Sequence, residues 1–226
     1  MYSALFVSDA HIGSSKRADE FLDFLDEVKT KKLFLVGDLI DVVCDGPDEQ
    51  LDRFFDIIKN KDCEVFYFFG NHEKENPHIN GSLAHYFKDI KIYDSYIYSG
   101  LKYKLFIEHG DSFHNKDIFN RLLKFSLKKF KRVLFKNKSK KEQLAKKKGI
   151  YYKIKPIIRN MLYNSFVNYM ASRAKKNNCD GVICGHLHCL EQKEINNIIY
   201  INCGDWLNLN SFVIEDNNGN LELVRY

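Results

Sequence analysis

The chain has 226 residues, of which 45% are hydrophobic, enough to build a globular core in one large domain or two small ones. No apolar run approaches the roughly 18 residues that a membrane-spanning helix needs, so we expect no transmembrane segment. The net charge of +5 is unevenly distributed: residues 116–176 carry 20 Lys or Arg and two acidic residues, or +18, whereas the rest carries 15 basic and 28 acidic residues, or −13. A strongly basic segment and an acidic body therefore share one chain.

The N-terminal sequence and the pattern of cysteines indicate the cellular compartment. The N-terminal sequence MYSALFVSDAHIG places Asp9 and His11 where a signal peptide would have its apolar stretch and cleavage site. The six cysteines form no C-x-x-C pair and lie mostly in apolar, strand-like segments. We therefore expect reduced cysteines and a cytoplasmic protein.

Short apolar runs rich in Val, Ile and Phe predict the strands. In chain order these runs are ALFVSD, KLFLVGD, EVFYFFGN, KLFIEHGD, GVICGH and IYINCGD. The segments between the first three runs have apolar residues at helical spacing, namely Phe21, Leu22, Leu25 and Val28, then Leu51, Phe54, Phe55 and Ile58. This alternation predicts a β-α-β-α-β opening.

The pattern changes from about Asp117 to Lys176, where the apolar residues follow a helical period of 3.6. Strand-like runs then resume, and EDNNGNLELV predicts a hairpin through Asn218 and Gly219. We therefore expect a core made of residues 1–114 and 177–226, with a basic amphipathic helical insertion, the cap, at 115–176.

Polar side chains follow the predicted strands at the points where they end. They are Asp9, His11, Asp38, Asn71, His72, His109, His186 and His188. Ligand sites in such sheets lie at the carboxyl ends of the strands, so these residues are expected to share one site. Oxygen and nitrogen donors without thiolate suit Mn²⁺, Fe or Zn²⁺, and this number of donors suits two ions. A pair of such ions promotes hydrolysis of phosphoesters.

Each of these polar motifs, taken alone, also has a purely structural interpretation. A lone histidine after a strand is usually a hydrogen-bonded structural residue, and a lone Gly-Asp is usually a turn. Five such pieces, each directly after an apolar strand, favour a metal centre instead.

The ordered motifs D-x-H, G-D-x-x-D, G-N-H-E, H-G-D and G-H-x-H resemble those of the calcineurin-like metallophosphoesterases. The resemblance covers the chain except residues 115–176, and it implies an α/β (α+β) fold, a four-layer αββα sandwich with a helical cap. It also implies two divalent ions, Mn²⁺ in the first place with Fe or Zn²⁺ as alternatives. One ion would be held by Asp9, His11, Asp38 and His188, and the other by Asp38, Asn71, His109 and His186. The catalytic residues would be the bridging Asp38 and His72, which would assist at the phosphoryl oxygen or leaving group.

A further segment, YINCGDWLNLN, resembles the N-x-G-D-W-V-E segment of UDP-2,3-diacylglucosamine diphosphatases. The resemblance implies hydrolysis of UDP-2,3-diacylglucosamine to UMP and 2,3-diacylglucosamine 1-phosphate in lipid A synthesis. Two differences stand out: Leu207 and Asn208 replace the usual Val-Glu, and His72 stands where the best-known branch has arginine.

The basic insertion suits a lipid-linked anion, because an apolar helical face can meet acyl chains or a bilayer while lysines meet phosphate groups. Lys153, Lys155 and Arg159 are the predicted substrate-phosphate contacts. The expected partners are a nucleotide-linked lipid and an anionic membrane surface, with the protein peripheral on the inner face of the inner membrane.

Other readings of the insertion and of the whole chain stay open. The apolar face of the insertion can pack on the core while its lysines are solvated. The enzyme can act on single-stranded nucleic acid, on a nucleotide or on a phosphoprotein. A scaffold that has lost its metals is a further reading.

Overall fold

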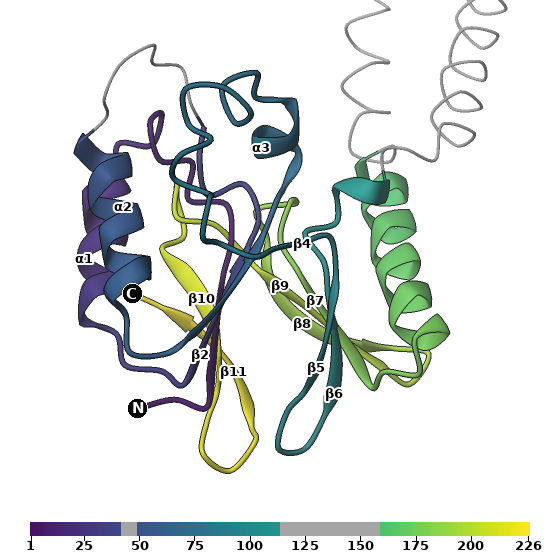
Figure 1. Ribbon diagram of the computed structural model, residues 1–226. Helices are drawn as coiled ribbons and strands as arrows, with labels where there is room; N and C mark the ends of the chain where they lie inside the picture. Colours follow the sequence, from purple (N-terminus) through teal and green to yellow (C-terminus); the bar gives the residue numbers. More distant parts are fainter. Residues whose placement is uncertain (42–48, 114–158) are drawn as a thin grey trace, which may run out of the picture. The chain divides into compact units, whose positions relative to one another are not determined.

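The computed structural model describes residues 1–41, 49–113 and 159–226. The chain forms two compact units, one made of Met1–Asp111 and Met170–Tyr226 and the other of Ser112–Tyr169. The larger unit contains two β-sheets (Figure 1). Most of the insertion predicted at 115–176 lies outside the described residues.

The first sheet has six strands in the order β11-β10-β1-β2-β3-β4. The strands are β1 (Ala4–Val7), β2 (Lys32–Val36), β3 (Glu64–Phe68), β4 (Ile92–Tyr93), β10 (Ser211–Glu215) and β11 (Leu221–Arg225). From β1 to β4 the pairs are parallel, whereas β10 runs antiparallel to both β1 and β11. The predicted strands at the start of the chain and the hairpin at its end are thereby confirmed.

The second sheet has five strands in the order β5-β6-β7-β9-β8. They are β5 (Tyr96–Ser99), β6 (Lys104–Ile107), β7 (Gly181–Cys184), β8 (Leu190–Ile195) and β9 (Ile198–Cys203). The three central strands β6, β7 and β9 are parallel, and an antiparallel strand closes each edge. The carboxyl ends of the parallel strands in each sheet therefore lie at one edge of that sheet.

Helices cover the outer faces of the two sheets. In Figure 1, α1 (Ala18–Glu27) and α2 (Glu49–Asn60) lie side by side against the first sheet. Both bury the predicted apolar face, with Phe21, Leu22 and Leu25 in α1 and Leu51, Phe54, Phe55 and Ile58 in α2. A helix at 159–176 ends in the larger unit, where the Arg173 guanidinium lies 5.2 Å from the ring centroid of Phe106 in β6. The order of layers is helix, sheet, sheet, helix, which confirms the expected sandwich.

The strands of the first sheet bury both faces, as β1 illustrates. Leu5 and Val7 belong to the core between the sheet and α1 and α2, whereas Ala4 and Phe6 belong to the core between the two sheets. Phe6, Phe34 and Phe66 are register partners on successive strands, and their rings stack at centroid distances of 4.7 and 4.5 Å. Such pairs contribute about 0.5–1.5 kcal/mol each beyond simple burial. The stack holds three of the strands whose ends carry the predicted site residues.

Candidate metal centre

The seven predicted ligands lie within four residues of the ends of five strands. Asp9 and His11 follow β1, Asp38 follows β2, Asn71 opens α3 (Asn71–Glu75) after β3, His109 follows β6, and His186 and His188 follow β7. Backbone hydrogen bonds continue beyond the strands, because the Asp9 N–H donates to Gly37 O at 3.0 Å. The Gly185 N–H likewise donates to His109 O at 3.1 Å. The ligand loops are thus joined to one another by their main chains.

The backbone of this region is unusual. Five of the seven predicted ligands have positive φ: Asp9 at 55°, His11 at 50°, Asp38 at 52°, His186 at 70° and His188 at 51°. Residues other than glycine seldom adopt this left-handed conformation, and it persists where the surrounding structure imposes it. Strained residues of this kind cluster at functional sites, so the strain supports a functional role for the three loops that carry them.

Two glycines show how closely the loops approach. Gly37 has φ +82°, and a Cβ placed on it would lie 2.6 Å from the His109 ring. A Cβ on Gly185 would lie 1.8 Å from Ser8 Oγ and 2.4 Å from Asp9 Oδ2. A side chain at either position would push the ligand loops apart.

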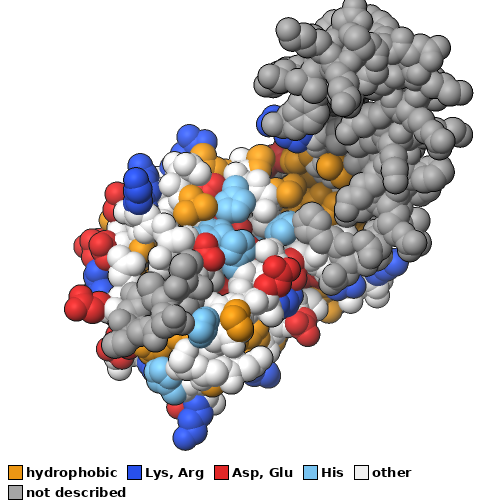
Figure 2. Space-filling model, turned by 90° about the horizontal axis from the view of Figure 1, so that it is seen from above, with side chains coloured by type: hydrophobic (Ala, Val, Ile, Leu, Met, Phe, Trp, Pro, Cys, Tyr) orange, Lys and Arg blue, Asp and Glu red, His pale blue; other side chains and the backbone are white. Residues whose placement is uncertain are grey.

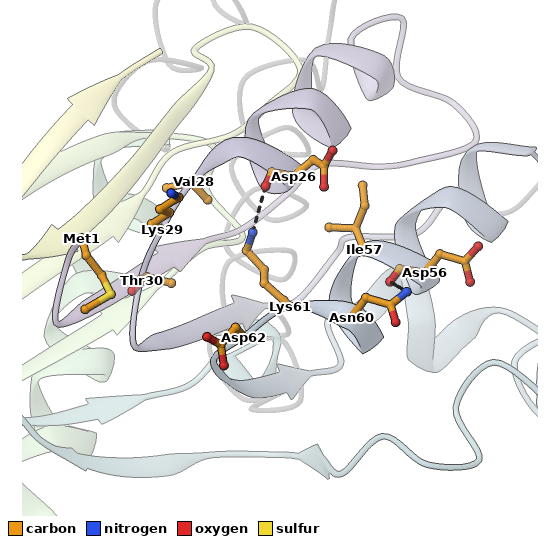
Figure 3. Close-up of a pocket in the computed structure, with 10 residues that line it drawn as sticks. All are labelled: Met1, Asp26, Val28, Lys29, Thr30, Asp56, Ile57, Asn60, Lys61 and Asp62. Carbon is orange, nitrogen blue, oxygen red and sulfur yellow. Dashed lines mark hydrogen bonds between the residues drawn. The ribbon is translucent and has the colours of Figure 1, made fainter.

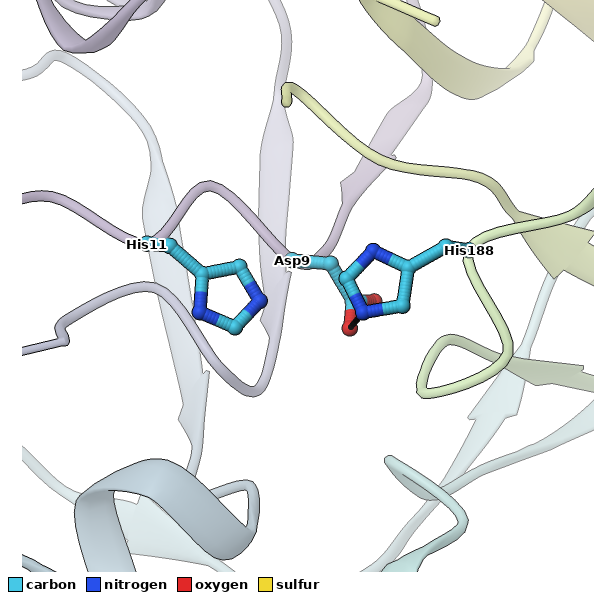
Figure 4. Close-up of side chains that lie close together, drawn as sticks. All are labelled: Asp9, His11 and His188. Carbon is cyan, nitrogen blue, oxygen red and sulfur yellow. Dashed lines mark ion pairs between the residues drawn. The ribbon is translucent and has the colours of Figure 1, made fainter. Parts of the chain in front are cut away.

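The first group of ligand atoms comes from Asp9, His11 and His188, whose ligand atoms lie within 4.8 Å of one another (Figure 4). Asp9 Oδ2 accepts hydrogen bonds from the Ser8 hydroxyl and, at 2.9 Å, from the His186 N–H. This leaves Asp9 Oδ1 facing His188 Nε2 at 3.4 Å. One carboxylate oxygen is fixed by the protein, and the other is directed into the group.

The second group comes from Asp38, His109 and His186, again within 4.8 Å. Asp38 Oδ2 lies 3.2 Å from His109 Nε2, and Asp38 Oδ1 accepts the His72 N–H at 2.8 Å. Asn71 stands next to His72, at the start of α3. Asp38 also forms a group with His11 and His72, so it lies between the two sets of ligands.

The polar atoms left over at the centre fit bound cations. Among the described residues, Asp9 Oδ1, His11 Nε2, Asn71 Oδ1 and His109 Nε2 are buried and have no hydrogen-bond partner. Buried polar atoms are rarely left without a partner, so each such atom calls for a ligand. Carboxylate, amide and imidazole donors are those that Mn²⁺, Fe and Zn²⁺ accept. The residues present therefore fit two divalent ions.

The charges of the groups agree with this fit. Burial alone would raise the pKa of Asp38, but the positively charged His109 imidazole, with Nε2 3.2 Å from Asp38 Oδ2, outweighs it and holds this pKa well below its usual range. Burial alone would lower the pKa of His109, yet Asp38 and Asp9 raise it to about 9. The carboxylates thus attract positive charge to the centre.

His72 lies at the open side of the centre, with its side chain 37% exposed. Its Nε2 is 3.9 Å from Asp38 Oδ2, and its Nδ1 is 3.0 Å from Asp41 Oδ1. Burial alone would lower the pKa of His72, but the hydrogen bond to Asp41 and the charges of Asp38 and Asp41 raise it above its ordinary value. Figure 2 shows histidine side chains gathered on this face of the molecule, with acidic side chains beside them.

Two orienting carboxylates, Asp41 and Asp205, are not among the predicted site residues. Asp41 is the second aspartate of GDLID, and Asp205 is the aspartate of the GDW segment. Asp205 Oδ2 lies 3.5 Å from His188 Nδ1, while its Oδ1 accepts N–H groups from Leu207, Asn208 and Leu209 at 2.6–3.1 Å. A carboxylate behind a ligating histidine fixes the tautomer and orientation of the ring. Both aspartates stood in motifs already singled out, so the signal was present in the sequence.

Of the three predicted substrate contacts, the structure describes only Arg159. Lys153 and Lys155 fall outside the described residues, and Arg159 is an exposed residue in the helix described over 159–176. No helix among the described residues is long and apolar enough to cross a membrane.

A surface pocket of about 570 Å³ lies elsewhere on the larger unit (Figure 3). It is lined by residues near the ends of α1 and α2, including Asp26, Asn60 and Lys61, whose amine donates to the Leu25 and Asp26 carbonyls. No predicted ligand lines it, so we assign the chemistry to the strand ends.

One protein family matches most of the chain, and a similar fold occurs among solved structures. The family model for calcineurin-like phosphoesterases matches residues 2–190. No curated protein matches the chain in sequence. Two similar solved structures are the E. coli phosphoesterase YfcE (15% identity, 98% of each chain, TM-score 0.49) and an archaeal phosphodiesterase (14% identity, 99% of each chain, TM-score 0.49). Vps29 from Chaetomium thermophilum shares the fold at 11% identity, over 100% of this chain and 96% of its own, with a TM-score of 0.51.

The family model spans most of the chain and includes every predicted metal ligand. Members of this family use a dinuclear divalent metal site, and the candidate ligand groups for such a site are present in this chain. The protein therefore belongs to the calcineurin-like phosphoesterases.

Proposed function

We propose that the protein hydrolyses a phosphorus ester or anhydride with two divalent ions. The observation that carries this proposal is the position of Asp38, whose carboxylate lies within 4.8 Å of ligand atoms of His109 and His186 in one group and of His11 in another. Two ions in such a site supply a nucleophile at neutral pH and neutralise charge on the phosphoryl oxygens. The four buried polar atoms without partners support the same reading.

The chain's own residues have distinct tasks in this proposal. Asp38 is oriented by the His72 N–H, and Asp9 by Ser8 and the His186 N–H. His72 is held at Nδ1 by Asp41, so its Nε2 is directed to the Asp38 side of the centre. The ring is thereby oriented toward the centre by a carboxylate at Nδ1, which suits donation of a proton from Nε2 to the leaving-group oxygen.

For the substrate we propose UDP-2,3-diacylglucosamine. Water would add to the α-phosphorus and the pyrophosphate P–O bond would break, releasing UMP and 2,3-diacylglucosamine 1-phosphate. The segment that resembles the diphosphatases supports this choice because it contacts the metal loops. The Asn202 side-chain amide donates to Gly185 O at 2.6 Å, and Asp205 lies behind His188. Trp206 of the same segment is fully buried in the core against α1.

The basic insertion is proposed to serve this substrate. Its position between HGD and GHLH matches that of the cap in the diphosphatases, and its +18 charge suits an anionic lipid surface. We propose that Lys153, Lys155 and Arg159 contact the substrate phosphates, and that the protein is cytoplasmic and peripheral on the inner membrane. The same charge would also attract single-stranded nucleic acid, which is the main alternative substrate.

An assay of the purified protein with Mn²⁺ tests the reaction and the substrate together. UDP-2,3-diacylglucosamine, a UDP-sugar, a dinucleotide, a phosphopeptide and single-stranded DNA are compared side by side. We expect UMP release from the lipid and little turnover of the others. Cleavage of another substrate without UMP release from the lipid would support the proposed hydrolase activity but overturn the lipid as its substrate. Turnover of none of these substrates would favour a scaffold that has lost its metals.

A triple variant tests the proposed contacts with the substrate phosphates in the same assay. Changing Lys153, Lys155 and Arg159 together to Ala is expected to raise KM for the lipid with little change in kcat, because ground-state binding is lost. The matched control changes Lys29, Lys59 and Lys88, three exposed lysines of the larger unit, to Ala. An unchanged KM in the first variant would remove these residues from the substrate site.

A further inference from the structure

Glu73, the last residue of the GNHE motif, is a buried carboxylate outside the predicted ligand set. Its exposure is 1%. Four main-chain N–H groups donate to it: Leu39 at 2.6 Å and Ile40 at 3.1 Å to Oε1, and Asp38 and Gly70 at 2.9 Å each to Oε2. Three of these donors are consecutive residues of the loop after β2, and the fourth belongs to the loop after β3.

Burying a carboxylate is costly, and here the cost is increased by a neighbour of the same sign. The Asp38 carboxylate is that neighbour, and the four main-chain hydrogen bonds to Glu73 offset the cost. An apolar side chain could fill the same space without this cost. The role of the carboxylate therefore lies in the main-chain N–H groups that it binds.

The four bonds connect Glu73 to the loop that carries Asp38. Asp38 has a left-handed φ of 52°, a conformation that needs support from its surroundings. The loop after β3 presses against the same residue, since a Cβ on Gly70 would lie 2.1 Å from Asp38 Oδ1. One carboxylate thus fixes the backbone of Asp38 and ties it to the loop that carries Asn71 and His72.

We infer that Glu73 is a positioning residue that holds Asp38 in the orientation both groups of metal ligands require. The inference rests on the proposed two-metal function. It assigns Glu73 no contact with substrate or metal; Glu73 acts through the main chain of residues 38–40. Loss of the carboxylate would release Asp38, so one ion would bind more weakly and the two ions would lose their common ligand.

The test measures metal binding directly and does not depend on a substrate. In Glu73→Gln the side chain keeps its shape, but its NH₂ group faces two N–H donors and can accept from neither. We expect a folded protein that binds one Mn²⁺ ion about 10- to 100-fold more weakly in calorimetric titration, as is typical when a residue behind a metal ligand is changed. In electron paramagnetic resonance, we expect the exchange-coupled signal of a Mn²⁺ pair to be replaced by the six-line signal of isolated ions.

Glu215→Gln is the matched control. Glu215 is another fully buried carboxylate, which accepts hydrogen bonds from the Tyr98 hydroxyl and the Leu101 N–H. This variant should lose stability but keep both metal affinities and the coupled signal, which separates positioning from general stabilisation. Glu73→Asp retains the charge on a shorter side chain. It takes the place of Glu73→Gln in the metal titration if that variant does not fold. It should bind the second ion more weakly than the wild type but more tightly than any folded Gln variant.

Wild-type metal affinities and a coupled signal in a folded Glu73→Gln or Glu73→Asp protein would overturn the inference and leave the proposed function intact. A wild-type protein that binds no pair of ions would overturn the two-metal function, and the role of Glu73 with it. The two failures are therefore distinguishable.

Discussion

At the scale of single residues, the centre depends on carboxylates that orient its histidines. Asp41 holds Nδ1 of His72, and Asp205 lies behind Nδ1 of His188. In both rings Nε2 is left to face an aspartate of the centre, Asp38 or Asp9. The reactive side of each ring is thus set by a residue that need not touch a metal or substrate itself.

Asp41→Asn is expected to lower the pKa of His72, because the variant loses the negative charge that helps to raise it. NMR titration of the His72 imidazole in the metal-free protein measures this directly. If protonated His72 assists the leaving group, the high-pH limb of the kcat profile of the metal-loaded enzyme should move to lower pH as well. Asp89→Asn, at an exposed aspartate, is the control. An unchanged His72 pKa in Asp41→Asn would show that Asp41 does not set the protonation of this ring.

At the scale of elements, the site depends on the close approach of loops from the two sheets. Gly185 follows β7 in the second sheet, and Ser8 and Asp9 follow β1 in the first sheet. The missing side chain of Gly185 is what allows Ser8 Oγ and Asp9 Oδ2 to lie where they do. The hydrogen bond from the His186 N–H to Asp9 then joins the two loops.

Gly185→Ala is expected to destabilise the protein by about 1–3 kcal/mol, since the added methyl overlaps buried atoms that have little room to move. It should also weaken metal binding, because the displaced atoms belong to the loop of Asp9. Denaturant unfolding and calorimetric metal titration measure the two effects. Gly81→Ala, where the nearest atoms are 3.7 Å from the added methyl, should change neither. Equal behaviour of the two variants would contradict the close packing of these loops.

At the scale of the larger unit, a buried hydrogen bond connects the two sheets away from the metal centre. Glu215 ends β10 of the first sheet, and Tyr98 lies in β5 of the second. The Tyr98 hydroxyl and the Leu101 N–H both donate to the Glu215 carboxylate, which is fully buried. Burial, together with the hydrogen bond to Glu215, raises the pKa of Tyr98, so the hydroxyl remains a donor at neutral pH.

Tyr98→Phe is expected to lower the free energy of unfolding by about 1.5–3 kcal/mol, because a buried charged acceptor loses one of its donors. Chemical denaturation measures this change, and metal affinity should stay at the wild-type value. Tyr96→Phe is the control, since the Tyr96 hydroxyl forms no hydrogen bond among the described residues. Weaker metal binding in Tyr98→Phe would mean that the contact between the sheets supports the centre itself.

The sequence by itself determined the strands of the interior and the candidate ligands. An apolar run such as ALFV has only one stable environment, between two buried layers, and the polar residues that follow it must then lie at the sheet edge. Three strands were not predicted, β4, β5 and β8. β4 has only two residues, whereas β5 (YIYS) and β8 (LEQKEI) are the edge strands of the second sheet, in which exposed and partly exposed residues replace a buried apolar run.

Only the tertiary structure decided how the ligand loops are held. Glu73 accepts hydrogen bonds from N–H groups of the loop after β2, whereas Asp41 and Asp205 each lie next to a histidine Nδ1 from another loop. Each carboxylate meets these partners only after the sheets have assembled. The left-handed φ of Asp9, His11, Asp38, His186 and His188 has the same origin. Local sequence preference disfavours this conformation for residues other than glycine, so it must be imposed by the packing of the loops around the centre.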